Sequence, residues 1–171
     1  MRLRPLNPDS AEEITLVANR MRDTLTEVEG EERGTAMYTQ EWLENRVRWH
    51  LDAEQVCAQV IVACDADGMI CGHTIYRIEQ NSEDRFGLIS TTYVLPTHRQ
   101  SGIASRLLLS AHDWFLSQGI YSSNTWTSAT NTKLIALYQK YGYTIAEQGS
   151  NDLTGTLMVR LTVQLSASGI C

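Results

Sequence analysis

The sequence predicts an α/β (α+β) protein in which helices flank a mixed, mainly antiparallel central sheet. Three observations predict this class: hydrophobic residues recur with a helical period over 8–51, the pattern becomes β-rich over 58–95, and helix and strand patterns alternate over 103–165. With 171 residues, 43% of them hydrophobic, the chain has the size of one domain. We therefore expect a single domain over 1–171, with a loose tail at about 166–171.

Two helices are expected before the first strand. The first covers 8–25, where Asp9 or Ser10 can cap the helix and apolar residues follow at helical spacing. The second covers 39–51, where Thr39 precedes another broad apolar face. Both helices should therefore lay one face on the sheet.

The rest of the chain reads as strands separated by two further helices. Strands are expected over 58–64, 69–79, 86–95, 121–129, 143–148 and 154–165, and the turn 65–68 joins the first two as a hairpin. A leucine-rich helix begins near Gly102, and another helix covers 130–142 and ends at a glycine. The predicted order is ααβββαβαββ.

Charge and composition exclude several classes of partner. The net charge of −6 argues against nucleic acid, because phosphate binding needs clustered Lys and Arg. No apolar run approaches the roughly 20 residues that span a bilayer, and the first residues lack the apolar core of a signal peptide. Cys57, Cys64, Cys71 and Cys171 lack zinc-site spacing. We expect a cytoplasmic protein with reduced cysteines, no metal and no membrane partner.

The segment 94–111 joins a strand to a helix in a way that suits an anion. Pro96 ends the strand, and the first N–H groups of the following helix have no partner within that helix. Gly102 and Ala104 leave room for a close ligand, and Arg99 adds a full positive charge. A pyrophosphate would fit this junction, whereas the alternative is a plain strand-to-helix turn with an incidental arginine.

Two motifs in this part of the chain resemble those of the GNAT superfamily of acyl-CoA-dependent N-acetyltransferases. TYVLPTHRQSGIASRLL is similar to the family's acyl-CoA signature, Gln/Arg-x-x-Gly-x-Gly/Ala, through Arg99, Gly102 and Ala104. NTKLIALYQKYGY is similar to Asn-x-x-Ala-x-x-Leu-Tyr-x-Lys-x-Gly-Phe, with Leu134 in place of the small residue and a tyrosine in place of the final Phe. The resemblance covers about 56–163 and implies the GNAT-like acyl-CoA N-acyltransferase fold.

The resemblance implies a site for acetyl-CoA as co-substrate. Backbone groups of Thr92, Tyr93 and Val94 would face the pantetheine and the thioester, and Asn131 would bond the pantetheine arm. The pyrophosphate would lie on backbone N–H groups of one continuous stretch: Arg99, Gln100, Ser101, Gly102, Ile103 and Ala104.

Tyr138 follows Asn131 by seven residues, as in the family, and the resemblance implies that it protonates or stabilises the departing thiolate. The alternative is a packing role, because Leu134, Tyr138 and Tyr141 share one helical face.

The general base is left unassigned. No Asp or Glu occurs between Leu88 and Leu95, where several relatives hold their base, and Trp126 stands where relatives that acetylate protein N-termini can carry a glutamate. Glu79 and Glu83, acting through water, and His73 are candidates, but a surface loop carboxylate or a satisfied strand histidine is the better explanation of them.

An acidic stretch between the two N-terminal helices suggests a cationic acceptor. Its members are Asp23, Glu27, Glu29, Glu31 and Glu32. A solvated loop is the alternative reading of such a stretch. Trp42 and Trp49 either line an acceptor pocket or form a buried helix face.

These features predict an enzyme that transfers an acetyl group from acetyl-CoA to a primary amine of a small molecule or peptide, by direct attack in a ternary complex. A non-catalytic acyl-CoA-binding module is the alternative of a different class. A homodimer is left open, as is the identity of the acceptor.

Overall fold

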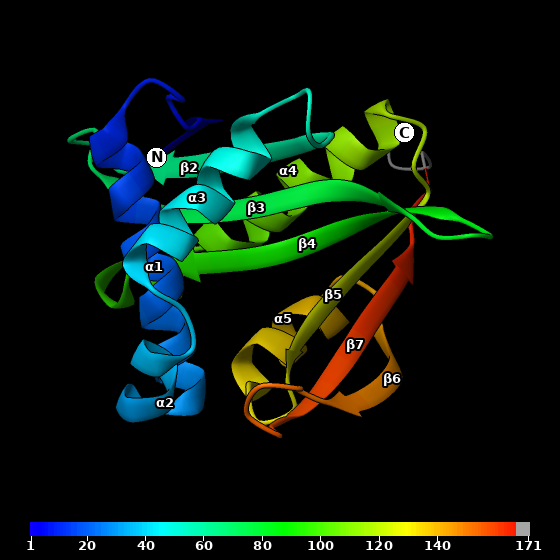
Figure 1. Cartoon of the computed structure of the whole chain (residues 1–171). Helices are drawn as coiled ribbons and strands as arrows, with labels where there is room; N and C mark the ends of the chain where they lie inside the picture. Colours follow the sequence, from blue (N-terminus) through cyan, green and yellow to red (C-terminus); the bar gives the residue numbers. More distant parts are fainter. Residues whose placement is uncertain (167–171) are drawn as a thin grey trace.

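The computed structural model describes residues 1–166 and contains one seven-stranded sheet with the order β1-β2-β3-β4-β5-β7-β6 (Figure 1). The strands are β1 (Arg2–Pro5), β2 (Ala58–Cys64), β3 (Ile70–Gln80), β4 (Arg85–Val94), β5 (Ser122–Ser128), β6 (Thr144–Ser150) and β7 (Leu157–Gln164). The helices are α1 (Ala11–Glu29), α2 (Glu31–Ala36), α3 (Gln40–Leu51), α4 (Ile103–Ser117) and α5 (Thr132–Lys140), with a 3-10 turn η1 over Pro96–His98. The predicted fold class is confirmed.

Every neighbouring pair of strands is antiparallel except β4 and β5, which are parallel. A parallel pair needs a crossover connection, and α4 provides it between these two strands. The mixed, mainly antiparallel sheet expected from the sequence is therefore present.

Two elements were absent from the sequence prediction. β1 has only four residues, and its strand conformation comes from pairing with β2, where Arg2 lies opposite Cys64 and Pro5 opposite Ile61. α2 has six residues, no side-chain cap and an internal glycine, Gly34, so its local helix signal is weak although Glu31 and Glu32 stand in its first turn. The tail expected at about 166–171 lies almost entirely outside the described residues.

Helices cover both faces of the sheet and create two apolar cores. α1 and α3 bury Ile14, Val17 and Leu43 against β2 and β3 on one face. On the other face, α4 buries Leu107 and Phe115 against β3, β4 and β7. In Figure 1, α3 lies in front of the sheet and α4 behind it. None of the helices in the described range is long and apolar enough to cross a bilayer.

The sheet opens between β4 and β5. These strands pair only from Gly87–Ser123 to Ile89–Thr125, and the Thr125 hydroxyl then donates to the Ile89 carbonyl at 2.9 Å. The register of β4 against β3 shifts at this point, so that Ser90 is an extra residue in β4. Beyond it, β4 stays with β3 and β5 stays with β7, and the two strands diverge (Figure 1). We call this opening the β4–β5 gap.

Candidate active site

The chain between β4 and α4 leaves backbone donors facing open space. Gln100 and Gly102 both have a positive φ, 62° and 80°, and Gly102 caps α4 without any side-chain hydrogen bond. A Cβ atom built at Gly102 would meet no other atom within 4 Å. The first N–H groups of α4 therefore face space that a ligand can enter, and the helix dipole favours an anion there.

A cleft of about 540 Å³ lies in front of this helix end, and we call it the donor cleft. It is lined by β4, by the start of α4, by the start of α5 and by the C-terminal half of α1. Most residues proposed from the sequence to hold the cofactor line it: Thr92, Tyr93, Val94, Arg99, Gln100, Gly102, Ile103, Ala104 and Asn131. Ser101 is not among the lining residues, and its hydroxyl donates to the His98 carbonyl instead.

Arg99 lines the donor cleft but its charge is already paired. Its Nε donates to the Val94 carbonyl at 2.9 Å, and its Nη2 lies 2.7 Å from Oε1 of Glu27 on α1. Lys133, in the first turn of α5, is a second cation in the cleft and was missed by the sequence analysis. Its only sequence signal is its place two residues after Asn131.

Asn131 has a structural task as well as a place in the cleft. Its Oδ1 accepts from the N–H of Leu134 at 3.4 Å, which caps α5, and its Nδ2 donates to Thr127 Oγ1 at 3.4 Å. Both bonds are long, so a ligand could compete for the same atoms.

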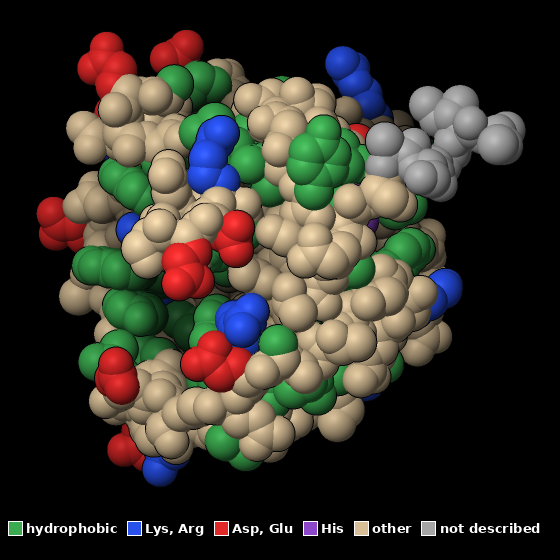
Figure 2. All heavy atoms as spheres, turned by 90° about the vertical axis from the view of Figure 1, so that its right-hand side faces the viewer, with side chains coloured by type: hydrophobic (Ala, Val, Ile, Leu, Met, Phe, Trp, Pro, Cys, Tyr) green, Lys and Arg blue, Asp and Glu red, His purple; other side chains and the backbone are tan. Residues whose placement is uncertain are grey.

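A second cavity of about 320 Å³ lies beside α3, and we call it the acceptor cavity. It shares Thr24, Val28, Thr92, Asn131 and Leu134 with the donor cleft, so the two spaces meet at the β4–β5 gap. Figure 2 views the molecule from the β3–β4 hairpin end and shows hydrophobic side chains recessed in a hollow toward its left edge. Aromatic lining includes Tyr38 and Trp42, whose rings stack with centroids 4.1 Å apart.

Tyr138 lines the acceptor cavity close to this meeting point. It is only 2% exposed, and burial raises the pKa of its hydroxyl to about 12 even though the hydroxyls of Thr92 and Thr125 lower it. Its ring packs edge-on against Tyr143 at 4.8 Å. The hydroxyl is thus a protonated donor at neutral pH, on a ring that also serves in packing.

The candidate bases from the sequence lie away from both spaces. Glu79 bonds Arg77 at 2.5 Å, Glu83 is exposed in the β3–β4 turn, and neither lines the donor cleft or the acceptor cavity. His73 is fully buried under Tyr93, and burial lowers its pKa to about 3. Among the described residues, Glu29 is the only one with a carboxylate that lines the acceptor cavity. This carboxylate accepts a hydrogen bond from the Thr156 hydroxyl at 2.6 Å.

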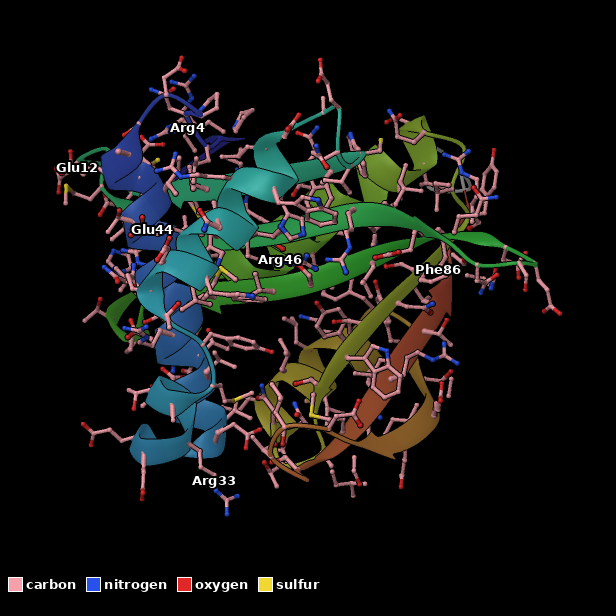
Figure 3. All side chains as sticks on the ribbon, viewed as in Figure 1. Arg4, Glu12, Arg33, Glu44, Arg46 and Phe86 are labelled. Carbon is pink, nitrogen blue, oxygen red and sulfur yellow. The ribbon has the colours of Figure 1, made fainter. Side chains whose placement is uncertain are left out.

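One wall of the acceptor cavity is basic, which the sequence analysis did not foresee. Arg46 and His50 reach it from α3, and Arg77 reaches it from β3. Figure 3 shows Arg46 on α3 over the strands β3 and β4. These residues are far apart in the sequence, so only the packing of α3 on the sheet brings them together. The acidic stretch is only partly in the site: Glu27 and Glu29 line it, whereas Glu31 and Glu32 are exposed.

Trp126 and Trp49 differ in their surroundings. Trp126 is 40% exposed and lines the acceptor cavity, so an aromatic ring rather than a carboxylate stands at this position. Trp49 does not line the cavity and instead packs against Arg46 and His50. Within residues 1–166, no group of three or more His, Cys, Asp or Glu side chains is placed to hold a metal ion.

Comparison with known proteins identifies the architecture. The model of the acetyltransferase (GNAT) family matches residues 18–143. A ribosomal-protein-alanine N-acetyltransferase from Brucella melitensis is 18% identical over 96% of this chain and 100% of its own, with a TM-score of 0.74. A spermidine N-acetyltransferase from Vibrio cholerae, solved with CoA and spermine, is 18% identical over 95% of this chain and 94% of its own, with a TM-score of 0.71.

A third solved structure, yncA from Salmonella typhimurium with its cofactor acetyl-CoA, is 16% identical over 100% of this chain and 97% of its own, with a TM-score of 0.72. No curated protein matches the chain significantly. Identities this low establish a shared fold, while the family model covers well over half of the sequence. The chain belongs to the GNAT acetyltransferase family.

Proposed function

We propose that this protein transfers an acetyl group from acetyl-CoA to a primary amine by direct attack in a ternary complex. The observation that carries the proposal is the meeting of the donor cleft and the acceptor cavity at the β4–β5 gap, where both share Thr92, Asn131 and Leu134. Two reactants can therefore lie end to end, and holding them so supplies much of the rate enhancement. The solved relatives that carry CoA or acetyl-CoA support the choice of donor.

The donor cleft fits a CoA-type ligand on its own geometry. Its open space at Gly102 and the unpartnered N–H groups of α4 suit a pyrophosphate, and Lys133 supplies a cation at its rim, across from the Arg99–Glu27 pair. Backbone groups of β4 beyond Ile89 have no β5 partner and can bond an extended arm. Acetyl-CoA, when bound, supplies the activated acetyl thioester.

Tyr138 is the proposed proton donor to the departing sulfur. Its hydroxyl stays protonated at neutral pH because burial raises its pKa to about 12. A buried donor that needs no reorganisation stabilises developing negative charge more than solvent would. We assign removal of the amine proton to Glu29, acting through water, since its carboxylate lines the acceptor cavity.

We also propose a cytoplasmic location. Cys57, Cys64 and Cys71 are free thiols in the structure, and unpaired cysteines are typical of reducing compartments.

Thiol release from acetyl-CoA tests the function directly. The protein is mixed with acetyl-CoA and a set of primary amines, and free thiol and acetylated amine are both measured. Matching amounts of the two products are expected. Tight CoA binding in calorimetry without turnover would instead identify a binding module, and absence of both binding and turnover would refute the proposal.

A further inference from the structure

The basic wall of the acceptor cavity, formed by Arg46, His50 and Arg77, carries more positive than negative charge. Among its charged neighbours, Glu79 pairs with Arg77 and lies outside the cavity lining. Glu44 is bound by the Thr15 hydroxyl at 3.0 Å and by Gln40, on the side of α3 that faces α1. One arginine of the wall is therefore left without an anion.

Arg77 is held rigidly within this wall. Its Nε bonds Glu79, and its Nη1 lies 3.1 Å from Nε2 of His50. Nδ1 of His50 lies 2.8 Å from the Arg46 carbonyl and must donate, so Nε2 is free to accept from Arg77. Burial lowers the pKa of His50 to about 4, which keeps the ring neutral at pH 7. Two neighbours thus orient the guanidinium, and the Arg77 side chain as a whole is only 11% exposed.

Arg46 is the arginine without an anion. Its guanidinium carbon lies 4.3 Å from the Trp49 ring centroid, which fixes the side chain by a cation–π contact. It forms none of the ion pairs found within residues 1–166. Burial and the nearby charge of Arg77 both lower the pKa of Arg46, and the charge of Glu79, which is bonded to Arg77, offsets this only in part. An anion placed between the two arginines would therefore relieve an unfavourable arrangement.

We infer that the acceptor amine carries an anionic group, a carboxylate, which binds Arg46 and Arg77 while the amine points toward Thr92 and Tyr138. The inference rests on the proposed function and names the acceptor class for that same site. Planar guanidinium groups match a carboxylate in geometry as well as in charge. A cavity of about 320 Å³ suits a molecule the size of an amino acid or the first residue of a peptide. This replaces the cationic acceptor suggested by the acidic stretch.

A matched set of amines tests the inference. 4-Aminobutanoate, butylamine and 1,4-diaminobutane share an amine and a four-carbon chain and differ only in the charge at the other end. We expect kcat/KM for 4-aminobutanoate to exceed that for butylamine by about 10- to 100-fold, the range for a charge-assisted hydrogen bond. The diamine should be the poorest of the three. Comparing the peptide amides Glu-Ala and Gln-Ala then shows whether a peptide carboxylate is accepted as well as a free acid.

Variants of α3 identify the residue responsible. Arg46→Gln should reduce the ratio of kcat/KM between 4-aminobutanoate and butylamine by about 10-fold or more. Arg46→Lys, which keeps the charge, should retain part of the ratio. Arg48→Gln is the matched control, because Arg48 is exposed on the same helix and does not line the cavity, and it should keep the wild-type ratio.

The outcomes separate this inference from the proposed function. Equal or better turnover of butylamine or 1,4-diaminobutane overturns the inference and leaves the acetyltransferase function standing. If no amine is acetylated, the proposed function fails, and calorimetry of 4-aminobutanoate on CoA-saturated protein decides the inference. Binding that is weakened in Arg46→Gln supports the carboxylate site, and absence of binding rejects it.

Discussion

Tyr138 has a packing role, through its ring, and a proposed chemical role, through its hydroxyl, and removing the hydroxyl oxygen alone tests the second. Tyr138→Phe keeps the ring against Tyr143 and removes only the hydroxyl beside Thr92 and Thr125. We expect kcat to fall by roughly 10- to 1,000-fold with little change in acetyl-CoA affinity, because a transition-state donor is lost. Steady-state kinetics and calorimetry measure the two effects. Tyr76→Phe is the control and should keep wild-type kcat, because Tyr76 is a buried tyrosine that lines neither the donor cleft nor the acceptor cavity. Wild-type kcat in Tyr138→Phe would show that Tyr138 has only a packing role.

The raised pKa of Tyr138 also predicts how activity depends on pH. A tyrosine with a pKa of about 12 remains protonated throughout the range in which amines become deprotonated. Any change in activity that is seen as the pH rises to about 10 should therefore not come from ionisation of Tyr138. Tyr138→Phe should accordingly leave the alkaline side of the plot of kcat against pH unshifted.

His73 predicts how the fold responds to acid. Both of its ring nitrogens are buried without a partner, and its folded pKa is about 3 against an ordinary value of 6.5. Between pH 6.5 and pH 3, His73 is therefore protonated in the unfolded chain and neutral in the folded protein. The free energy of unfolding is accordingly unaffected by this residue's titration above pH 6.5 and decreases as the pH falls toward 3. His73→Leu should lose less stability than wild type between pH 7 and pH 4.5, by on the order of 2 kcal/mol.

Urea unfolding at the two pH values measures this difference. His98→Gln is the control, since His98 is half-exposed at the surface near Asp65. An acid response of His73→Leu equal to that of wild type would show that His73 takes up its proton without unfolding. Retained kcat in His73→Leu would also remove it from the candidate bases, in agreement with its place outside both spaces.

At the scale of the element, the glycine that begins α4 can be compared with a second glycine of the same backbone conformation, Gly68, in the turn between β2 and β3. Gly102 and Gly68 have similar positive φ values, 80° and 83°, and a Cβ at either meets nothing within 4 Å. Changing each to Ala should destabilise the fold by a similar 1–2 kcal/mol or so, because both backbones are left-handed. Only Gly102→Ala should also weaken acetyl-CoA binding, by about 10-fold, since only that Cβ enters the donor cleft.

Thermal unfolding and calorimetry of both variants provide the comparison. Equal acetyl-CoA affinity in the two would mean that the ligand does not approach the backbone at this helix end, and the assignment of the pyrophosphate site would be withdrawn.

Local patterns predicted the elements whose signals are themselves local. Ser10 accepts from the N–H of Glu13 and Thr39 from that of Trp42, so both predicted helix starts have real caps. The short β1 and α2 could not be found in this way, because β1 depends on hydrogen bonds to β2 and α2 packs closely on α1. A Cβ at Gly34 would lie only 2.6 Å from Thr26 backbone atoms.

At the scale of the whole molecule, the sequence predicted one side of the site better than the other. The donor cleft is built mainly from two contiguous segments, β4 to α4 and the start of α5, which motifs describe well. The acceptor cavity gathers side chains from α1, α3, β3 and β5, and Arg46 and Arg77 meet there only after the sheet forms. The pairing of the acidic stretch was hidden from the sequence for the same reason: Glu27 forms an ion pair with Arg99, which is distant in the chain.

The β4–β5 gap has a consequence for the order of events during turnover. Because the donor cleft is lined by the start of α4 and the acceptor cavity by α3, with only five lining residues in common, we expect that neither reactant has to pass through the space of the other. Loading should follow no compulsory sequence, and each product should be able to depart while the other is still held. Initial-rate plots should therefore intersect, and an unreactive analogue of the amine should inhibit noncompetitively against acetyl-CoA, whereas compulsory binding of acetyl-CoA first would make it uncompetitive. Parallel plots would indicate instead that the first product leaves before the amine arrives, which a site with a separate space for each reactant does not require.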